Sequence, residues 1–136
     1  MWKLGKKDYT YGYKVHQLCY GRWVTKKGMY GTKISVGPNG LPWVINKKGR
    51  VHSLNSKDQW VMTYTRRKAV EIAVGPTNEV WILSGAITNK KGKTDYKIYK
   101  VANGRMQQVV GKALKIAVGR DGEPWILMSN NKIYRR

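Results

Sequence analysis

A stretch of twelve residues occurs three times along the chain. The copies read ISVGPNGLPWVI from Ile34, IAVGPTNEVWIL from Ile72 and IAVGRDGEPWIL from Ile116, and in each the tryptophan follows the glycine by six residues. A β-branched run, a turn segment and a second apolar run predict two short strands joined by a hairpin. A repeat with this fixed spacing indicates a fold built from equivalent units.

Each hairpin is flanked by two further apolar segments, which complete a unit of four short strands. The glycines of successive copies are 38 and 44 residues apart. Four-stranded units of this length are typical of β-propeller blades. The flanking segments begin at Trp23, Trp60 and Met106 upstream, and at Val51, Ile98 and Ile133 downstream.

The repeats predict an all-β fold, a single domain over 1–136 made of β-propeller blades with four antiparallel strands. We assign 1–20 to the last two strands of a blade, 21–54 to repeat 1, 55–102 to repeat 2 and 103–136 to repeat 3. The Ile-x-Val-Gly strand carries small residues, which favours the innermost position in each blade. The extra residues of repeat 2 predict a polar loop from Gly85 to Asp95.

About three and a half units form only a partial ring, and open strand edges in proteins are paired or covered. We therefore expect a homo-oligomer, or a larger assembly, that completes the propeller. The alternative is that the chain is a fragment of a longer protein.

The order of Trp, Ile-Ser-Val-Gly, a glycine turn, Trp and Ile-Tyr-Arg resembles the tectonin repeat of tachylectin-type proteins, from Trp23 to the end of the chain. Met106 departs from this pattern because it replaces the leading tryptophan of the third unit. The resemblance implies a β-propeller that acts as a non-catalytic, lectin-like binding surface. Its implied ligands are bacterial lipopolysaccharide, glycans, phospholipids or other proteins.

Charge is the second feature that constrains function, since 27 Lys and Arg oppose 7 Asp and Glu for a formal net charge of +20. Alternate turns of an antiparallel blade lie on opposite faces of a propeller. One set carries four basic and four acidic residues, whereas the other carries fourteen basic residues against Asp8 and Asp95. We predict that this basic face binds a polyanion, through Lys6, Lys7, Lys26, Lys27, Lys47, Lys48, Arg66, Arg67, Lys68, Lys90, Lys91, Lys93, Lys112 and Lys132.

Four interpretations of this face stay open. The first is docking on an anionic glycan, lipopolysaccharide or phospholipid surface. The second is a structural subunit of a ribonucleoprotein, a microtubule-associated assembly or a fibre, in which the face contacts RNA or acidic protein. The third is direct binding of nucleic acid, for which the chain carries no recognised motif. In the fourth, the lysines are simply solvated and keep a β-rich protein from aggregating.

The repeated tryptophans have two interpretations as well. Trp43, Trp81 and Trp125 either stack on sugar rings or form core contacts between adjacent sheets. His16 and His52 share their register with tyrosines, which favours packing over catalysis. The sequence carries no carboxylate pair, metal-ligand spacing or nucleophile triad, so we expect no enzyme activity, metal or cofactor.

No segment approaches the ~20 apolar residues that span a bilayer, and the first residues lack the apolar stretch of a secretion signal. We therefore expect a protein that is not transmembrane. The missing signal slightly favours an intracellular location, but the compartment stays open.

Overall fold

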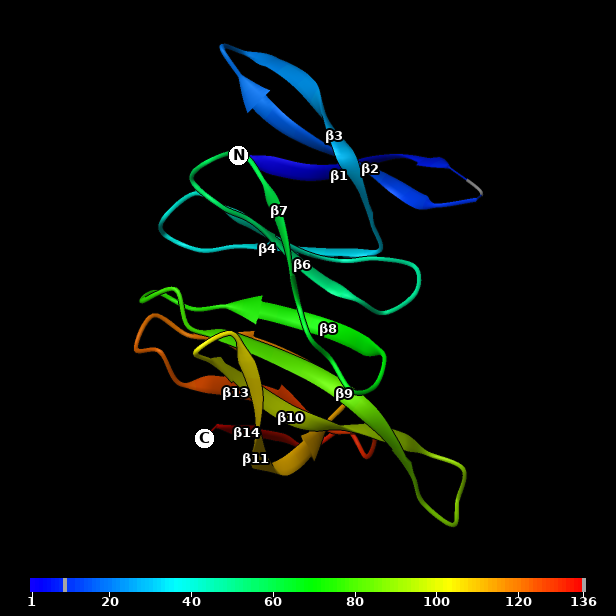
Figure 1. The fold of residues 1–136 in the computed structure, drawn as a ribbon. Coiled ribbons are helices and arrows are strands. Elements are labelled where there is room, and N and C mark those ends of the chain that lie inside the picture. Colours follow the sequence, from blue (N-terminus) through cyan, green and yellow to red (C-terminus); the bar gives the residue numbers. More distant parts are fainter. Residues whose placement is uncertain (9, 136) are drawn as a thin grey trace.

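The computed structural model describes residues 1–8 and 10–135, which form β-strands and turns without a helix (Figure 1). The strands pair into four antiparallel sheets, which confirms the all-β prediction. The first sheet contains β1 (Trp2–Asp8), β2 (Gly12–Cys19) and β3 (Arg22–Gly31), and the second contains β4 (Lys33–Val36), β5 (Pro42–Ile45), β6 (Val51–Leu54) and β7 (Trp60–Thr63). The third sheet contains β8 (Ala69–Val74), β9 (Val80–Thr88), β10 (Thr94–Ala102) and β11 (Arg105–Ala113). The fourth contains β12 (Lys115–Val118), β13 (Pro124–Leu127) and β14 (Ile133–Arg135).

The four sheets stack in chain order. Strand β4 contacts both β1 and β8, and β8 in turn contacts β12, so the first strand of each sheet lies in one row. Three of these strands carry the repeated Ile-x-Val-Gly sequence. The first and last sheets lie at opposite ends of the stack and do not close into a ring (Figure 1).

The sheets are offset by one strand from the units assigned on sequence. Trp23, Trp60 and Met106 were expected to open their units, yet each lies in the last strand of the preceding sheet, opposite Leu18, Leu54 and Val101. The reason is local, because tight turns join these segments to the strand before them. Each of these turns places a non-glycine residue at positive φ: Tyr20 before Trp23, Asp58 of the Asn55–Gln59 turn before Trp60, and Asn103 before Met106. The first sheet therefore lacks an Ile-x-Val-Gly strand, and the last lacks a fourth strand.

The expected polar loop from Gly85 to Asp95 is mostly strand. Strand β9 continues to Thr88 and β10 begins at Thr94, so only a short turn remains between them. A register shift at Tyr96 and a positive φ at Gly85 let the two strands stay paired beyond the length of the other hairpins.

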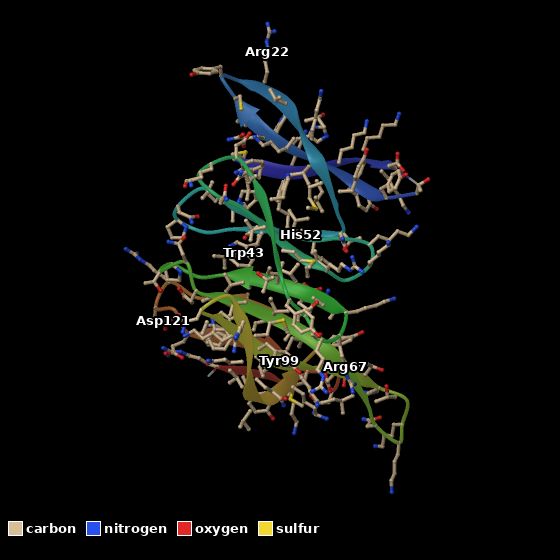
Figure 2. All side chains as sticks on the ribbon, viewed as in Figure 1. Arg22, Trp43, His52, Arg67, Tyr99 and Asp121 are labelled. Atoms are coloured by element: carbon tan, nitrogen blue, oxygen red, sulfur yellow. The ribbon has the colours of Figure 1, made fainter. Side chains whose placement is uncertain are left out.

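The repeated tryptophans explain the small residues of the first strands. Trp43 pairs with Ser35, and the same register places Ala73 opposite Trp81 and Ala117 opposite Trp125. Trp43 lies between the second and third sheets (Figure 2) and packs against residues of the third. Trp81 packs in the same way against residues of the fourth sheet. Trp125 has no following sheet to cover it and is 47% exposed.

The glycine that ends the Ile-x-Val-Gly strand permits close approach between sheets. At Gly37 a Cβ would lie 2.7 Å from Val74 Cγ1, and at Gly75 it would lie 2.8 Å from Val118 Cγ1. A side chain at either position would therefore push the neighbouring first strands apart. The glycine serves packing here, because neither of these two residues has a positive φ.

Candidate polyanion-binding face

One side of the sheet stack gathers the turns that carry most of the positive charge. The β5–β6 turn lies against the start of β8, where Ala69 N–H donates to the Gly49 carbonyl at 2.9 Å. It also meets the β1–β2 turn, since Lys47 Nζ donates to the Thr10 carbonyl at 3.4 Å. Figure 1 shows these turns on the right of the stack, with the β9–β10 and β13–β14 turns below them. We call this side the basic face.

Twelve of the fourteen predicted basic residues are exposed: Lys6, Lys7, Lys27, Lys47, Lys48, Arg66, Arg67, Lys68, Lys90, Lys91, Lys93 and Lys132. The remaining two, Lys26 and Lys112, are half-buried and form ion pairs. Lys26 pairs with Asp58, a residue that the sequence places in the opposite set of turns. Arg67 lies on the basic face, and Asp121 on the opposite side (Figure 2).

Five of the predicted turn residues lie within strands instead. Lys26 and Lys27 belong to β3, because that strand continues through a bulge to Gly31. The positive φ of Gly28 allows the bulge, and the indole N–H of Trp60 holds it by donating to the Lys27 carbonyl at 3.2 Å. The other residues in strands are Lys6 and Lys7 of β1 and Lys112 of β11.

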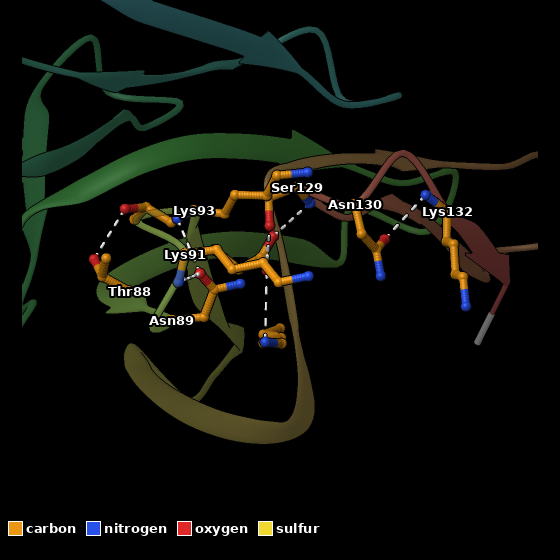
Figure 3. A network of polar contacts seen from close by, with 10 residues as sticks. Thr88, Asn89, Lys91, Lys93, Ser129, Asn130 and Lys132 are labelled. Carbon is orange, nitrogen blue, oxygen red and sulfur yellow. Dashed lines mark hydrogen bonds and ion pairs between the residues drawn. The ribbon is translucent and has the colours of Figure 1, made fainter.

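Asp95 was counted among the surface charges, but it is buried, with 2% of its surface exposed. Its carboxylate accepts hydrogen bonds from Ser129 N–H at 2.7 Å and from Ser129 Oγ at 2.8 Å (Figure 3). Lys112 Nζ lies 3.6 Å away. Asp95 therefore fastens the third sheet to the fourth, and its negative charge does not face solvent.

Two lysine turns on this face share one sequence and one geometry. Asn46-Lys-Lys-Gly-Arg50 and Asn89-Lys-Lys-Gly-Lys93 each place the glycine at a positive φ. In each turn the asparagine Oδ1 accepts two backbone N–H groups, at 3.0 Å from Lys48 and Arg50 in the first (Figure 3 shows the second). This Asx-type geometry fixes the backbone and leaves both lysine side chains exposed. The sequence interpretation missed the motif, although its repetition is visible in the chain.

Hollows connect the basic turns along this face. The first, of about 350 Å³, lies where the β1–β2 turn, the β3 bulge and the β5–β6 turn meet. It shares Met29 and Tyr30 with a hollow beside Lys26 and Lys27, and Arg50 with one beside Tyr64. Tyr64 also lines a hollow of about 670 Å³ that extends from Arg67 on this face, past Tyr99, to Arg105 of the opposite set of turns (Figure 2 labels Arg67 and Tyr99). Among the described residues, no Asp or Glu lines these four hollows.

His52 lines the first hollow, and its surroundings shift the protonation of its imidazole. Burial lowers the pKa of its imidazole, and the positive charge of Arg50 lowers it further, against a weaker opposing interaction with the Arg50 backbone. Its Nδ1 is buried without a hydrogen-bond partner among the described residues. Because the pKa is lowered, the ring is uncharged at neutral pH.

The three tryptophans weighed as sugar-stacking residues have different environments. Trp81 is 7% exposed, with Lys100 Nζ 5.2 Å from its ring centroid, so a ligand does not reach its ring. Trp43 is half-buried between sheets, and only Trp125 presents a large exposed surface. Tyrosines, rather than these tryptophans, lie beside the basic turns.

Comparison with known protein families and with curated proteins gives no match to this chain. Within residues 1–8 and 10–135 the structure has no helix that is long and apolar enough to cross a membrane. The same residues contain no cluster of three His, Cys, Asp or Glu side chains placed to hold a metal ion.

Proposed function

We propose that the chain is a non-catalytic binding module of the tectonin type, whose stacked sheets are blades of a partial β-propeller. Its basic face docks on anionic glycan, lipopolysaccharide or phospholipid surfaces. One observation carries this proposal: exposed lysines and arginines from all four sheets, most of them in turns, gather on one side of the stack. The hollows between those turns contain no described carboxylate to compete for the cations.

The fixed lysine turns support binding over simple solubility. Lysines that only keep a surface soluble need no defined backbone conformation. In the turns after Asn46 and Asn89, by contrast, the asparagine side chain fixes the backbone that carries two lysines. A turn backbone that is already ordered loses less entropy when the turn meets a charged surface. Attraction between such a face and a polyanion weakens as salt screens the charges.

The experiment compares two charge reversals of equal size. Lys48, Lys90 and Lys91 change to Glu on the basic face, and Arg22, Lys57 and Arg120 change to Glu on the opposite side. Cosedimentation with vesicles that contain lipopolysaccharide or anionic phospholipid reports binding at several salt concentrations. The first variant should lose binding by at least about tenfold, whereas the second keeps most of it. Equal losses would show that only net charge matters, and would overturn the proposal.

A second function, as a subunit of a larger assembly, is favoured by the exposed side of the last sheet. Trp43 and Trp81 are covered by the sheet that follows them, whereas Trp125 and the neighbouring Ile133 are 47% and 66% exposed. Covering this apolar surface would stabilise a homo-oligomer or a larger complex. RNA or acidic protein would then be the partner of the basic face.

A further inference from the structure

The first hollow of the basic face has three walls from separate segments. The β1–β2 turn contributes Thr10 and Tyr11, the β3 bulge contributes Tyr30, and the β5–β6 turn contributes Lys48 and Arg50. Its volume of about 350 Å³ is at the small end of the range of ligand sites, roughly 300–1,000 Å³. A space of this size holds one ring with its substituents.

The walls are fixed before any ligand arrives. The Asn46 side chain holds the β5–β6 turn through two backbone N–H groups. Trp60 holds the bulge through the Lys27 carbonyl, and Lys47 joins the β5–β6 turn to the Thr10 carbonyl. Pre-formed walls of this kind lower the cost of ordering the site on binding.

The chemistry of the walls differs from side to side. Lys47, Lys48 and Arg50 line one part of the hollow and supply a point charge or a planar guanidinium to an anion. Tyr11 and Tyr30 line another part, with ring centroids 5.3 Å apart and planes tilted by 36°. Tyr11 is 59% exposed, so a face of its ring is open to a ligand.

This combination defines the ligand. Lysine and arginine recognise the oxygens of a phosphate through charge-assisted hydrogen bonds, and an exposed tyrosine ring packs against the carbon face of a sugar while its hydroxyl remains available for hydrogen bonding. We propose that this hollow binds a single phosphorylated sugar unit, with the phosphate toward Lys48 and Arg50 and the sugar ring on Tyr11. The inference rests on the proposed function, because it names the unit that the module recognises on an anionic glycan surface.

Calorimetric titration of the whole chain tests the site with four small probes at one ionic strength. The probes are glucose 6-phosphate, glucose, inorganic phosphate and adenosine monophosphate. Glucose 6-phosphate should bind saturably with one site per chain, and at least about tenfold more tightly than inorganic phosphate or glucose. If inorganic phosphate bound as tightly as glucose 6-phosphate, the site would recognise only the phosphate charge and the inference would be overturned. If adenosine monophosphate bound more tightly than glucose 6-phosphate, the assignment to a sugar phosphate would be overturned.

Two exposed residues of the hollow serve as variants, with a control on the opposite side of the stack. Arg50→Gln and Tyr11→Ala should each weaken glucose 6-phosphate binding by at least about tenfold. Lys57→Gln removes the same charge as Arg50→Gln from a turn outside the basic face and should leave that binding unchanged. Thermal melting of each variant checks that the fold is kept, and unchanged affinity in the folded Tyr11→Ala chain would contradict the role of the ring.

The vesicle experiment separates this inference from the function on which it rests. If the chain binds lipopolysaccharide vesicles through the basic face but shows no glucose 6-phosphate binding, the inference fails while the proposed function stands. If the basic-face reversal loses both vesicle binding and glucose 6-phosphate binding, whereas Tyr11→Ala loses only glucose 6-phosphate binding, the proposed function and the inference are both supported.

Discussion

The indole N–H of Trp60 donates a 3.2 Å hydrogen bond to the backbone carbonyl of Lys27 and so joins the last strands of the first two sheets. Trp2 makes a matching bond in the other direction, since its indole N–H donates at 2.8 Å to the Gly40 carbonyl in the second sheet. Two tryptophans therefore hold this pair of sheets from opposite ends, and one of them supports the bulge that lines the candidate site.

Replacement of Trp60 by Phe should destabilise the chain by about 0.5–1.5 kcal/mol, because it removes the donor to Lys27 and keeps most of the aromatic packing. Chemical denaturation with urea measures the change. Trp23→Phe is the matched control, since Trp23 is 39% exposed, and it should have the smaller effect. A larger loss at Trp23 would contradict the importance assigned to the bond between sheets.

Gly75→Ala should destabilise the chain by about 1–3 kcal/mol, because the new methyl group would displace the Glu79 carboxyl and would also meet Val118 Cγ1 of the fourth sheet at 2.8 Å. The equivalent change at Gly119 has its three nearest contacts, Asp121, Trp125 and Glu123, within its own sheet and so does not push two sheets apart. Urea unfolding should therefore show a clearly smaller loss for Gly119→Ala. Equal losses would indicate that both glycines matter for a reason other than sheet contact.

Asp95→Ala should cost about 1–3 kcal/mol, because it leaves the Ser129 N–H and Oγ without their buried acceptor. Ser129→Ala removes only the side-chain donor and should cost less. Denaturation of both variants checks the order. If Asp95 served instead as a surface charge that weakens polyanion binding, its removal would strengthen vesicle binding without changing stability.

The stability of the fold should depend on the protonation of His52. Its folded-state pKa is lowered from 6.5 by burial and by Arg50, so the folded state binds fewer protons than the unfolded state below about that pH. The contribution of neutral His52 is therefore present above the unfolded pKa and is lost as the pH falls toward the folded pKa. Unfolding measured at successive pH values should show this decline.

His52→Tyr places at this position the residue found in the same register of the third and fourth sheets. The variant should show a shallower fall of stability between neutral and mildly acidic pH. His16→Tyr, in the first sheet, provides the control for losing an imidazole. An identical pH profile in the wild type and in His52→Tyr would exclude the proposed titration.

Trp125→Ser combined with Ile133→Ser should reduce self-association, because these side chains form the exposed apolar side of the last sheet. Sedimentation velocity at several protein concentrations measures the oligomeric state. The wild-type chain should sediment as more than a monomer and the double variant as a smaller species. A monomeric wild type would contradict the role of this surface in homo-oligomers.

The all-β class and the hairpins were predictable from sequence because their signals are local. The alternation of apolar residues and the glycine-containing turns define each hairpin within about ten residues. The assignment of Trp23, Trp60 and Met106 to sheets was wrong, because a strand carries little information about which of its two neighbours it pairs with. Tight turns at Asp58 and Asn103 decide that pairing.

The candidate site was predictable in part. The lysines of the basic face could be grouped because alternate turns lie on opposite sides of an antiparallel sheet. The hollow beside Tyr11, Tyr30 and Arg50 could not, because it joins three segments whose contact depends on how the first two sheets stack. The burial of Asp95 depends in the same way on Ser129, which lies 34 residues further along the chain.

The two lysine turns, whose backbones are held by Asn46 and Asn89, have an evolutionary consequence. Asn46 and Asn89 satisfy the turn backbone through their own side chains. Apart from Lys47, which donates to the Thr10 carbonyl, the lysines that follow them, Lys48, Lys90 and Lys91, can therefore be replaced by other polar residues without loss of the turn. Selection can exchange those positions freely while the tryptophan and glycine contacts between sheets stay constant. A scaffold of this kind can acquire new ligands one turn at a time without losing its stability.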